Sequence, residues 1–163
     1  MKKPHVIPTH IFRETPAVGF YDATIDETNG CDVVRHGKKA QSPPKDADGN
    51  VQFYIHHHQV DNNLCVHGTR EFHLVYGGWD HPYHIVHLDA GSGSLTIPIG
   101  CYHRSISGPE GSVLINQSIR DDEFSFDTEF VPVSTADDEW LREVVNNCNP
   151  IHHWLRTDHQ VVS

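Results

Sequence analysis

The sequence predicts an all-β domain, a sandwich or small barrel of short antiparallel strands with one helix near the C-terminus. Val and Ile together number 27 whereas Leu numbers 7, and β-branched side chains favour pleated strands over helices. Gly and Pro residues separate the apolar stretches, so the predicted strands recur at roughly 8–12 residues, which is typical of sandwiches and barrels. The chain of 163 residues is long enough for one domain with a full core.

The sequence over residues 1–50 predicts an N-terminal arm and edge strands of this same domain. Their apolar pieces are short and interrupted by Pro and Gly, and Cys31–Arg35 is a short candidate strand. His36–Asn50 is polar, contains Pro43-Pro44 and ends in Asp48-Gly49-Asn50. This composition favours a loop that closes in a tight turn.

Residues 51–130 predict the β-barrel core. Val51, Phe53 and Ile55 alternate with residues of the opposite face, which is the period of a strand. We expect Gly68 and the Gly108–Gly111 segment to end strands in turns. The expected strands are Val51–His58, Asn62–Val66, Glu71–Tyr76, Tyr83–Leu88, Leu95–Ile99, His103–Ile106 and Ser112–Ile119.

Residues 131–163 predict a C-terminal helix and a tail. Thr135, followed three residues later by Asp138, is similar to a capping box. Trp140, Leu141, Val144 and Val145 form an apolar stripe at helical spacing. We therefore expect a helix over 136–147 that packs against the barrel.

The formal net charge of −10 argues against nucleic acid and anionic membrane surfaces as partners. The chain lacks the run of about 18 apolar residues that a membrane span needs, and no apolar stretch follows Met1–His5 to suggest a signal peptide. The four cysteines form no CxxC pair, which fits reduced thiols and a cytoplasmic location.

Histidine carries the chemical signal, with 15 residues in the chain. His56 and His58 lie two apart on a predicted strand, so both are expected on one face, whereas His57 lies on the other. His103 opens a later strand, which in an antiparallel barrel could lie beside the first. Three neutral imidazoles at one place suit a divalent first-row metal with open coordination positions.

The pair His56-x-His58, followed by an acidic residue and Gly68, resembles the first motif of the cupin superfamily. Pro98-x-Gly100-x-x-His103 resembles its second motif. The resemblance implies a single-domain cupin-like β-sandwich or jelly roll with one divalent transition metal, Fe, Zn, Mn or Ni. Where cupins carry a glutamate after the second histidine, this chain has Asn62 and Asn63, so the fourth ligand is Gln59, Asp61, Asn63 or water.

Other polar residues near the motifs are candidates for substrate chemistry. Asp61 and Tyr102 are expected to act in catalysis by moving a proton. Arg104 is expected to bind an anionic substrate group. His73 and Tyr54 complete the expected substrate-binding residues.

These observations lead to three functional hypotheses. The first is a metal-dependent enzyme that isomerises, epimerises, cyclises or cleaves a small polar molecule by Lewis-acid and acid/base chemistry. A weaker similarity to nucleotide-sugar epimerases and ketoisomerases, in His58–Asp61 and in 103–121, favours a keto sugar. The second is a non-haem iron dioxygenase with a three-histidine site, and the third is a non-catalytic ligand-binding cupin. We also expect a homodimer formed by exchange of the N-terminal arm.

Overall fold

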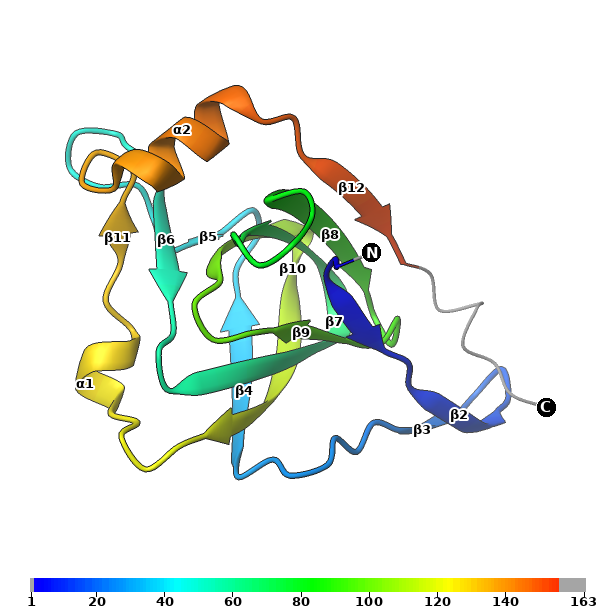
Figure 1. The fold of residues 1–163 in the computed structure, drawn as a ribbon. Helices are drawn as coiled ribbons and strands as arrows, with labels where there is room; N and C mark the ends of the chain where they lie inside the picture. Colours follow the sequence, from blue (N-terminus) through cyan, green and yellow to red (C-terminus); the bar gives the residue numbers. More distant parts are fainter. Residues whose placement is uncertain (1, 156–163) are drawn as a thin grey trace.

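The computed structural model describes residues 2–155. In this part of the chain ten strands form one strongly curved sheet and two more form a separate hairpin (Figure 1). The strands are β1 (His5–Ile7), β2 (His10–Glu14), β3 (Gly19–Asp22), β4 (Gly30–His36), β5 (Gln41–Ser42), β6 (Gln52–Ile55), β7 (Gln59–Val75), β8 (Tyr83–Asp89), β9 (Ser94–Ile97), β10 (Tyr102–Arg120), β11 (Val133–Ser134) and β12 (Ile151–Trp154). The helices are α1 (Phe126–Glu129) and α2 (Glu139–Asn147). The predicted all-β class is confirmed.

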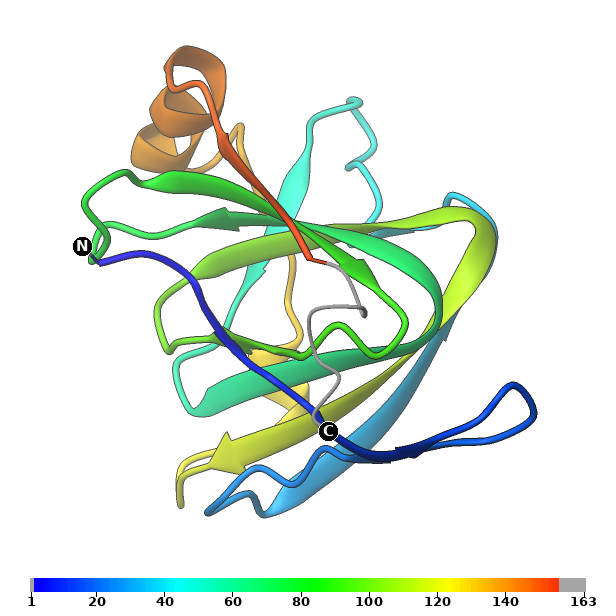
Figure 2. The same ribbon diagram turned by 90° about the vertical axis from the view of Figure 1, so that its right-hand side faces the viewer.

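Two long antiparallel strands, β7 and β10, run through both walls of the barrel (Figures 1 and 2). The first part of β7 pairs with β9, and its second part pairs with β8. The first part of β10 pairs with β5 and β6, and its second part pairs with β4. The two walls therefore belong to one sheet, and the sheet turns from one wall into the other at the bends of β7 and β10.

The bends lie at glycines that we expected to end strands. Gly68 has φ +72° and Gly111 has φ +79°, a conformation that L-residues with a Cβ rarely adopt. A Cβ on Gly68 would lie 2.0 Å from the carbonyl oxygen of Gly111, so the two strands touch at this point. The separate strands expected over 62–66 and 71–76 are one strand, as are those over 103–106 and 112–119.

The apolar core lies inside the barrel, with residues from both sides of the bend. Its buried residues include Phe72, Leu74, Val86, Leu88, Leu95, Ile97 and Leu114. A second cluster lies between the outer face of β6–β8 and helix α2, where Phe53 and Ile85 pack with Leu141 and Val144. The helix therefore packs against the barrel wall, as its apolar stripe predicts.

The expected helix begins later than the sequence suggests. Asp138, rather than Thr135, is the N-cap of α2, because its carboxylate accepts a hydrogen bond from the backbone N–H of Leu141 at 2.9 Å. Trp140 belongs to the expected stripe but is 45% exposed. The short helix α1 and strand β12 were not expected, and residues 156–163 of the expected tail lie outside the described residues.

The remaining expectations concern the N-terminal residues and the cysteines. β1 pairs with β9 at a sheet edge, and β4, which includes the expected strand Cys31–Arg35, belongs to the main sheet. All four cysteines are free thiols, as expected. Among residues 2–155, no helix is long and apolar enough to cross a membrane.

Candidate active site

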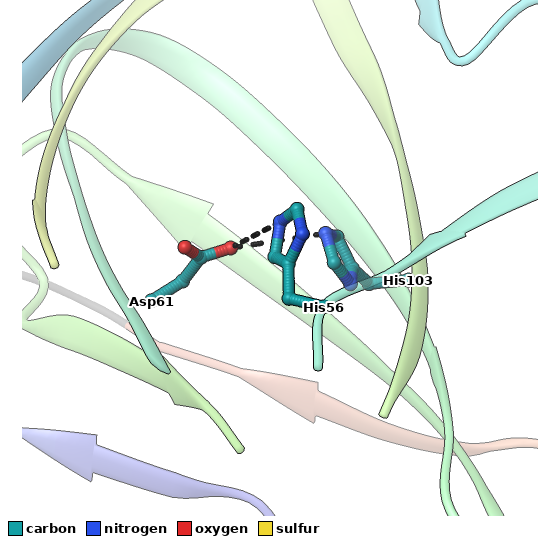
Figure 3. A group of neighbouring side chains, drawn as sticks. All are labelled: His56, Asp61 and His103. Carbon is teal, nitrogen blue, oxygen red and sulfur yellow. Dashed lines mark ion pairs between the residues drawn. The ribbon is translucent and has the colours of Figure 1, made fainter. Parts of the chain in front are cut away.

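Three buried side chains, two imidazoles and one carboxylate, meet inside the barrel. His56 follows the end of β6, Asp61 lies near the start of β7, and His103 is the second residue of β10. Asp61 Oδ2 lies 3.4 Å from His56 Nε2 and 3.7 Å from His103 Nε2. One carboxylate oxygen therefore faces both rings (Figure 3).

Strand pairing brings these distant residues together. β6 and β10 are antiparallel, with His103 opposite Tyr54, so both side chains lie on the inner face. The strand that carries His103 therefore lies beside the strand that leads to His56, as expected. The two ring centroids of His56 and His103 are 4.7 Å apart.

Backbone carbonyl groups fix the orientation of both imidazoles. His56 Nδ1 donates to the carbonyl oxygen of Glu129 at 2.8 Å, and His103 Nδ1 donates to that of Cys101 at 3.1 Å. Because a carbonyl oxygen only accepts, each Nδ1 carries a proton. In the neutral tautomers, the Nε2 lone pairs of both rings therefore face Asp61.

Amide groups hold the other oxygen of the carboxylate. Gln59 Nε2 donates to Asp61 Oδ1 at 2.6 Å, and Asn116 Nδ2 donates to the same oxygen at 2.9 Å. Arg120 Nε in turn donates to Gln59 Oε1 at 2.8 Å. These bonds orient Asp61 so that Oδ2 remains directed at the imidazoles.

The three groups have shifted pKa values in different directions. Burial opposes protonation of His56, but the hydrogen bond and charge of Asp61 outweigh it and raise its pKa. Burial would raise the pKa of Asp61, but His56 and His103 lower it. Burial lowers the pKa of His103 to about 4, so this ring is neutral near pH 7. Pairs of titratable groups with divergent pKa values are typical of acid/base sites.

The cluster lines a cavity of about 210 Å³. Most of its lining residues have polar side chains that can form hydrogen bonds with a polar ligand such as a sugar, and apolar side chains contribute the rest of the wall. The lining residues are Val34, His36, Ser42, Tyr54, His56, Gln59, Asp61, Asn63, Arg70, Phe72, His103, Ser105, Leu114 and Phe130.

Five of the nine residues singled out from the sequence line this cavity. They are Tyr54, His56, Gln59, Asp61 and His103. Asn63, one of the alternatives for a fourth metal ligand, lines it as well. Gln59 lies in the cavity, but its side chain bonds to Asp61 and Arg120 rather than facing the two imidazoles.

Two expected histidines, the metal ligand His58 and the substrate-binding residue His73, do not reach the cavity. The predicted strand ends at Ile55, and the bend that follows breaks the alternation, so that His58 Nδ1 lies 2.9 Å from Asp121 Oδ2. His73 lies on the outer face of β7, where its Nδ1 lies 2.9 Å from the hydroxyl of Tyr83. Neither ring lines the cavity.

Two more expected residues flank His103 and therefore face away from the cavity. Successive residues of a strand point to opposite faces, so Tyr102 and Arg104 lie on the other side of the wall from His103. The Tyr102 hydroxyl donates to Asp138, the N-cap of α2. Arg104 Nη2 donates to Gln41 Oε1 at 3.1 Å.

Sequence reasoning missed several residues of the site, among them Asn116, Glu129 and Arg70. Asn116 orients Asp61, Glu129 accepts from His56 and Arg70 lines the cavity. Arg70 lies two residues before Phe72, so both side chains lie on the inner face of β7. This spacing would have identified Arg70 if the strand had been expected to continue through Gly68. No local pattern marks Glu129, because α1 is a single short turn.

The donor set of the cluster fits a divalent metal. His56 Nε2, His103 Nε2 and Asp61 Oδ2 all offer lone pairs, and their ligand atoms lie within 4.8 Å of one another. An imidazole that donates its other N–H to a carbonyl is the common arrangement in metal sites. Two histidines and one carboxylate suit first-row metals, so these three residues would hold the ion.

Comparison with known proteins gives a fold but no sequence relative. No family model matches the chain, and no curated protein matches its sequence. Solved structures do match. A dTDP-4-dehydrorhamnose 3,5-epimerase from Elizabethkingia anophelis has a TM-score of 0.59 at 13% identity, covering 82% of this chain and 75% of that one.

Two further structures carry related names. A 4-keto-6-deoxy sugar epimerase from Streptomyces spheroides has a TM-score of 0.52 at 14% identity, covering 74% of this chain and 70% of that one. A 3,4-ketoisomerase mutant from Thermoanaerobacterium thermosaccharolyticum, in complex with TDP-4-keto-6-deoxyglucose, has a TM-score of 0.57 at 12% identity, covering 89% and 96%.

The fold, the inward-facing cluster and these neighbours place the chain in a class. It is a β-sandwich that shares the fold of these sugar epimerases and ketoisomerases, with a buried histidine–carboxylate group in its barrel. The expected single-domain β-sandwich fold is thereby confirmed.

Proposed function

We propose that the chain is an isomerase or epimerase that moves a proton at the carbon next to a carbonyl group of a small, sugar-like molecule. The observation that carries the proposal is the His56–Asp61 pair at the wall of a cavity that several polar side chains line. A proton-accepting imidazole paired with a carboxylate is the usual machinery for such a transfer.

The pair acts as one proton-accepting unit. It removes a proton from the substrate carbon, and the electron pair left behind moves onto the carbonyl oxygen to give an enol or enolate. Asp61 stabilises the imidazolium that forms at His56. Return of a proton from solvent to the opposite face of the same carbon gives an epimer. Return of the proton from His56 to the former carbonyl carbon, while the proton of the hydroxyl group on the first carbon moves to the enolate oxygen, gives the isomeric carbonyl compound.

Other lining residues complete the reaction site. The Tyr54 hydroxyl makes no hydrogen bond with the described residues, so it is available to donate to the substrate oxygen that gains charge. Phe130 packs edge-on against the His56 ring, with centroids 5.3 Å apart, and keeps water from that side of the imidazole.

The names of the structural neighbours support the keto-sugar class. They are described as sugar epimerases and ketoisomerases, and one holds TDP-4-keto-6-deoxyglucose. Shared fold alone does not fix an activity. The number of hydrogen-bonding side chains that line the cavity is the independent reason to favour a sugar over an apolar substrate.

Solvent exchange tests the proposal directly. TDP-4-keto-6-deoxyglucose is incubated with the protein in D₂O, and exchange of protons next to the carbonyl is followed by NMR. We expect exchange with the native protein and a loss of about 10²-fold or more in His56→Gln. His57→Gln is the matched control, because His57 is the exposed neighbour.

The proposal fails if the native protein catalyses no exchange in this keto sugar or in a panel of keto hexoses. It also fails if His56→Gln exchanges protons as fast as the native protein.

A metal-dependent form of the same enzyme is the second candidate. It is favoured by the two Nδ1 atoms fixed to carbonyl groups, which leave both Nε2 lone pairs and Asp61 Oδ2 directed at one point. A bound divalent metal would supply Lewis-acid polarisation of the substrate carbonyl. Metal dependence is a separate claim from the isomerase activity and is tested separately.

Metal analysis separates the two forms. The protein is dialysed separately against Fe, Zn, Mn and Ni salts and its metal content is measured by mass spectrometry. The metal-dependent form predicts about one equivalent, lost in His103→Gln but not in His57→Gln. An exchange rate unaffected by chelation supports the metal-free form, and oxygen consumption in the iron-loaded protein supports the dioxygenase alternative.

A further inference from the structure

A buried arginine at the cavity wall has no role in the proton transfer. Arg70 is 2% exposed and lines the cavity. Its Nε and Nη2 donate to Ser112 Oγ at 2.9 and 2.8 Å, and its Nη1 donates to Ser105 Oγ at 2.9 Å. These three bonds use three of the five N–H groups of a guanidinium, and both acceptors are neutral hydroxyl groups.

No negative charge of the described residues compensates this guanidinium. Asp61 is the only carboxylate among the described cavity-lining residues, and Gln59, Asn116 and the imidazoles already engage it. Burial lowers the pKa of Arg70 to about 10, with no opposing contribution from an anion. A buried charge that lacks a partner is costly, so such a residue is expected where a ligand provides the partner.

A second unpartnered group lies beside Arg70. His36, at the end of β4, lies opposite Ser112 in the strand register, and Ser112 is the hydroxyl that accepts two bonds from Arg70. His36 also lines the cavity, and its Nδ1 is buried without a hydrogen-bond partner among the described residues. The Arg70 guanidinium and the His36 ring thus border the same cavity, and each has a hydrogen-bonding group without a partner among the described residues.

We propose that Arg70, with His36 beside it, is the binding site for an anionic oxygen group of the ligand, a carboxylate or a phosphate. Nη1 and Nη2 each keep one N–H without an acceptor among the described residues, and a guanidinium commonly binds the paired oxygens of either group. The inference deepens the proposed function by naming a charged group on its substrate. It concerns binding alone and does not depend on turnover.

Direct titration of the native protein is the first experiment. Inorganic phosphate and pyruvate are added separately, with acetone as the uncharged probe, and the resonances of the Arg70 Nε–H and the His36 ring are followed by NMR. We expect saturable shifts at both residues with at least one anion and none with acetone. Saturation by phosphate alone or by pyruvate alone identifies the group.

Substitutions form the second experiment. Arg70→Met removes the charge at similar length, and we expect it to weaken binding of the saturating anion by about tenfold or more. Arg142→Met removes an equal charge on α2, outside the cavity, and is expected to bind like the native protein. Arg70→Lys keeps the charge without the paired donors and is expected to bind with intermediate affinity.

The outcomes separate this inference from the proposed function. Absence of anion-dependent shifts at Arg70 and His36, or unchanged affinity in a folded Arg70→Met, overturns the anion site even if proton exchange is observed. If Arg70→Met does not fold, the shifts in the native protein and the affinity of Arg70→Lys decide. Anion binding at Arg70 without proton exchange in any keto sugar leaves the site established and refutes the isomerase.

Discussion

At the scale of single residues, the alternation of side chains along β7 and β10 determines what reaches the cavity. His103 faces inward, so its neighbours Tyr102 and Arg104 face outward. The pair of motifs was sufficient to predict that His56 and His103 meet. The position of His58 could not be predicted, because it depends on a bend after Ile55 that no sequence pattern marks.

Asp61→Asn tests the electrostatics of the cluster. Asp61 provides the hydrogen bond and the charge that raise the pKa of His56, so we expect this pKa to fall below the ordinary value of 6.5 in the variant. NMR titration of the His56 ring measures the change, and the His57 ring in the same spectra is the internal control. An unchanged His56 titration contradicts the described pairing.

The sign of the stability change follows from the same pKa. A raised pKa in the folded protein gives His56 a stabilising contribution that is full below about pH 6.5 and is lost as the pH rises through the folded value. Because Asp61→Asn removes this contribution, the variant should lose more stability at pH 6 than at pH 8, as measured by urea unfolding. An equal loss at both pH values would show that the pair is not the cause.

At the scale of elements, the strands were predictable from period-two patterns, but their ends were not. From the sequence, Gly68 and Gly111 were expected to end strands in turns, but each lies at a bend in a strand that continues beyond it. Pairing with a neighbouring strand on both sides of the bend keeps the backbone extended, and this tertiary pairing is not encoded locally. Strand β12 was missed because four residues carry too little periodicity.

Gly68→Ala tests the contact at the bend. The added Cβ would lie 2.0 Å from a backbone oxygen, and the positive φ adds strain. We expect a loss of about 2 kcal/mol or more in the free energy of unfolding. Gly49→Ala is the matched control, because Gly49 has φ +83° but open space around it. Equal losses in the two variants would mean that the strand contact contributes nothing.

The docking of β12 on β8 should depend on pH. His84 Nε2 donates to the carbonyl of His81, so its Nδ1 accepts from His153 Nε2 at 2.9 Å. Burial lowers the pKa of His84 and His153, and nearby cations such as Lys3 lower them further. Since protonation removes the acceptor, docking is stable above about pH 6.5 and weakens as the pH falls.

Amide exchange of residues 151–154 at pH 8 and pH 5 measures this effect. We expect faster opening at pH 5 after correction for intrinsic exchange. His84→Gln should reduce the difference, because the acceptor of the pair no longer titrates. Equal opening at the two pH values would exclude the histidine pair as the cause.

At the scale of the whole molecule, the β2–β3 hairpin extends away from the barrel (Figure 2). Ile11 is buried at its base, whereas Phe12, Phe20 and Tyr21 are largely exposed on it. Exposed aromatic side chains on a projecting element are typical of association surfaces. The sequence predicted an N-terminal arm for exchange in a homodimer, and this hairpin is the segment that would provide it.

Sedimentation tests the homodimer. We expect a mass of twice the chain for the native protein and of one chain for a Phe12→Ser, Phe20→Ser double variant. Phe126→Ser is the control, because Phe126 is more exposed than Phe12 and Phe20 but lies on α1. A native protein that sediments as a single chain rules the homodimer out.

The continuity of β7 and β10 through both walls has a consequence for motion. Asp61, Arg70, His103 and Asn116 all lie on these two strands, whose mutual register extends over most of their length. No small part of the fold can unfold locally and expose these residues, because separating β7 from β10 would disrupt the whole barrel. The wall that carries these four residues is therefore expected to open only when the native state itself unfolds.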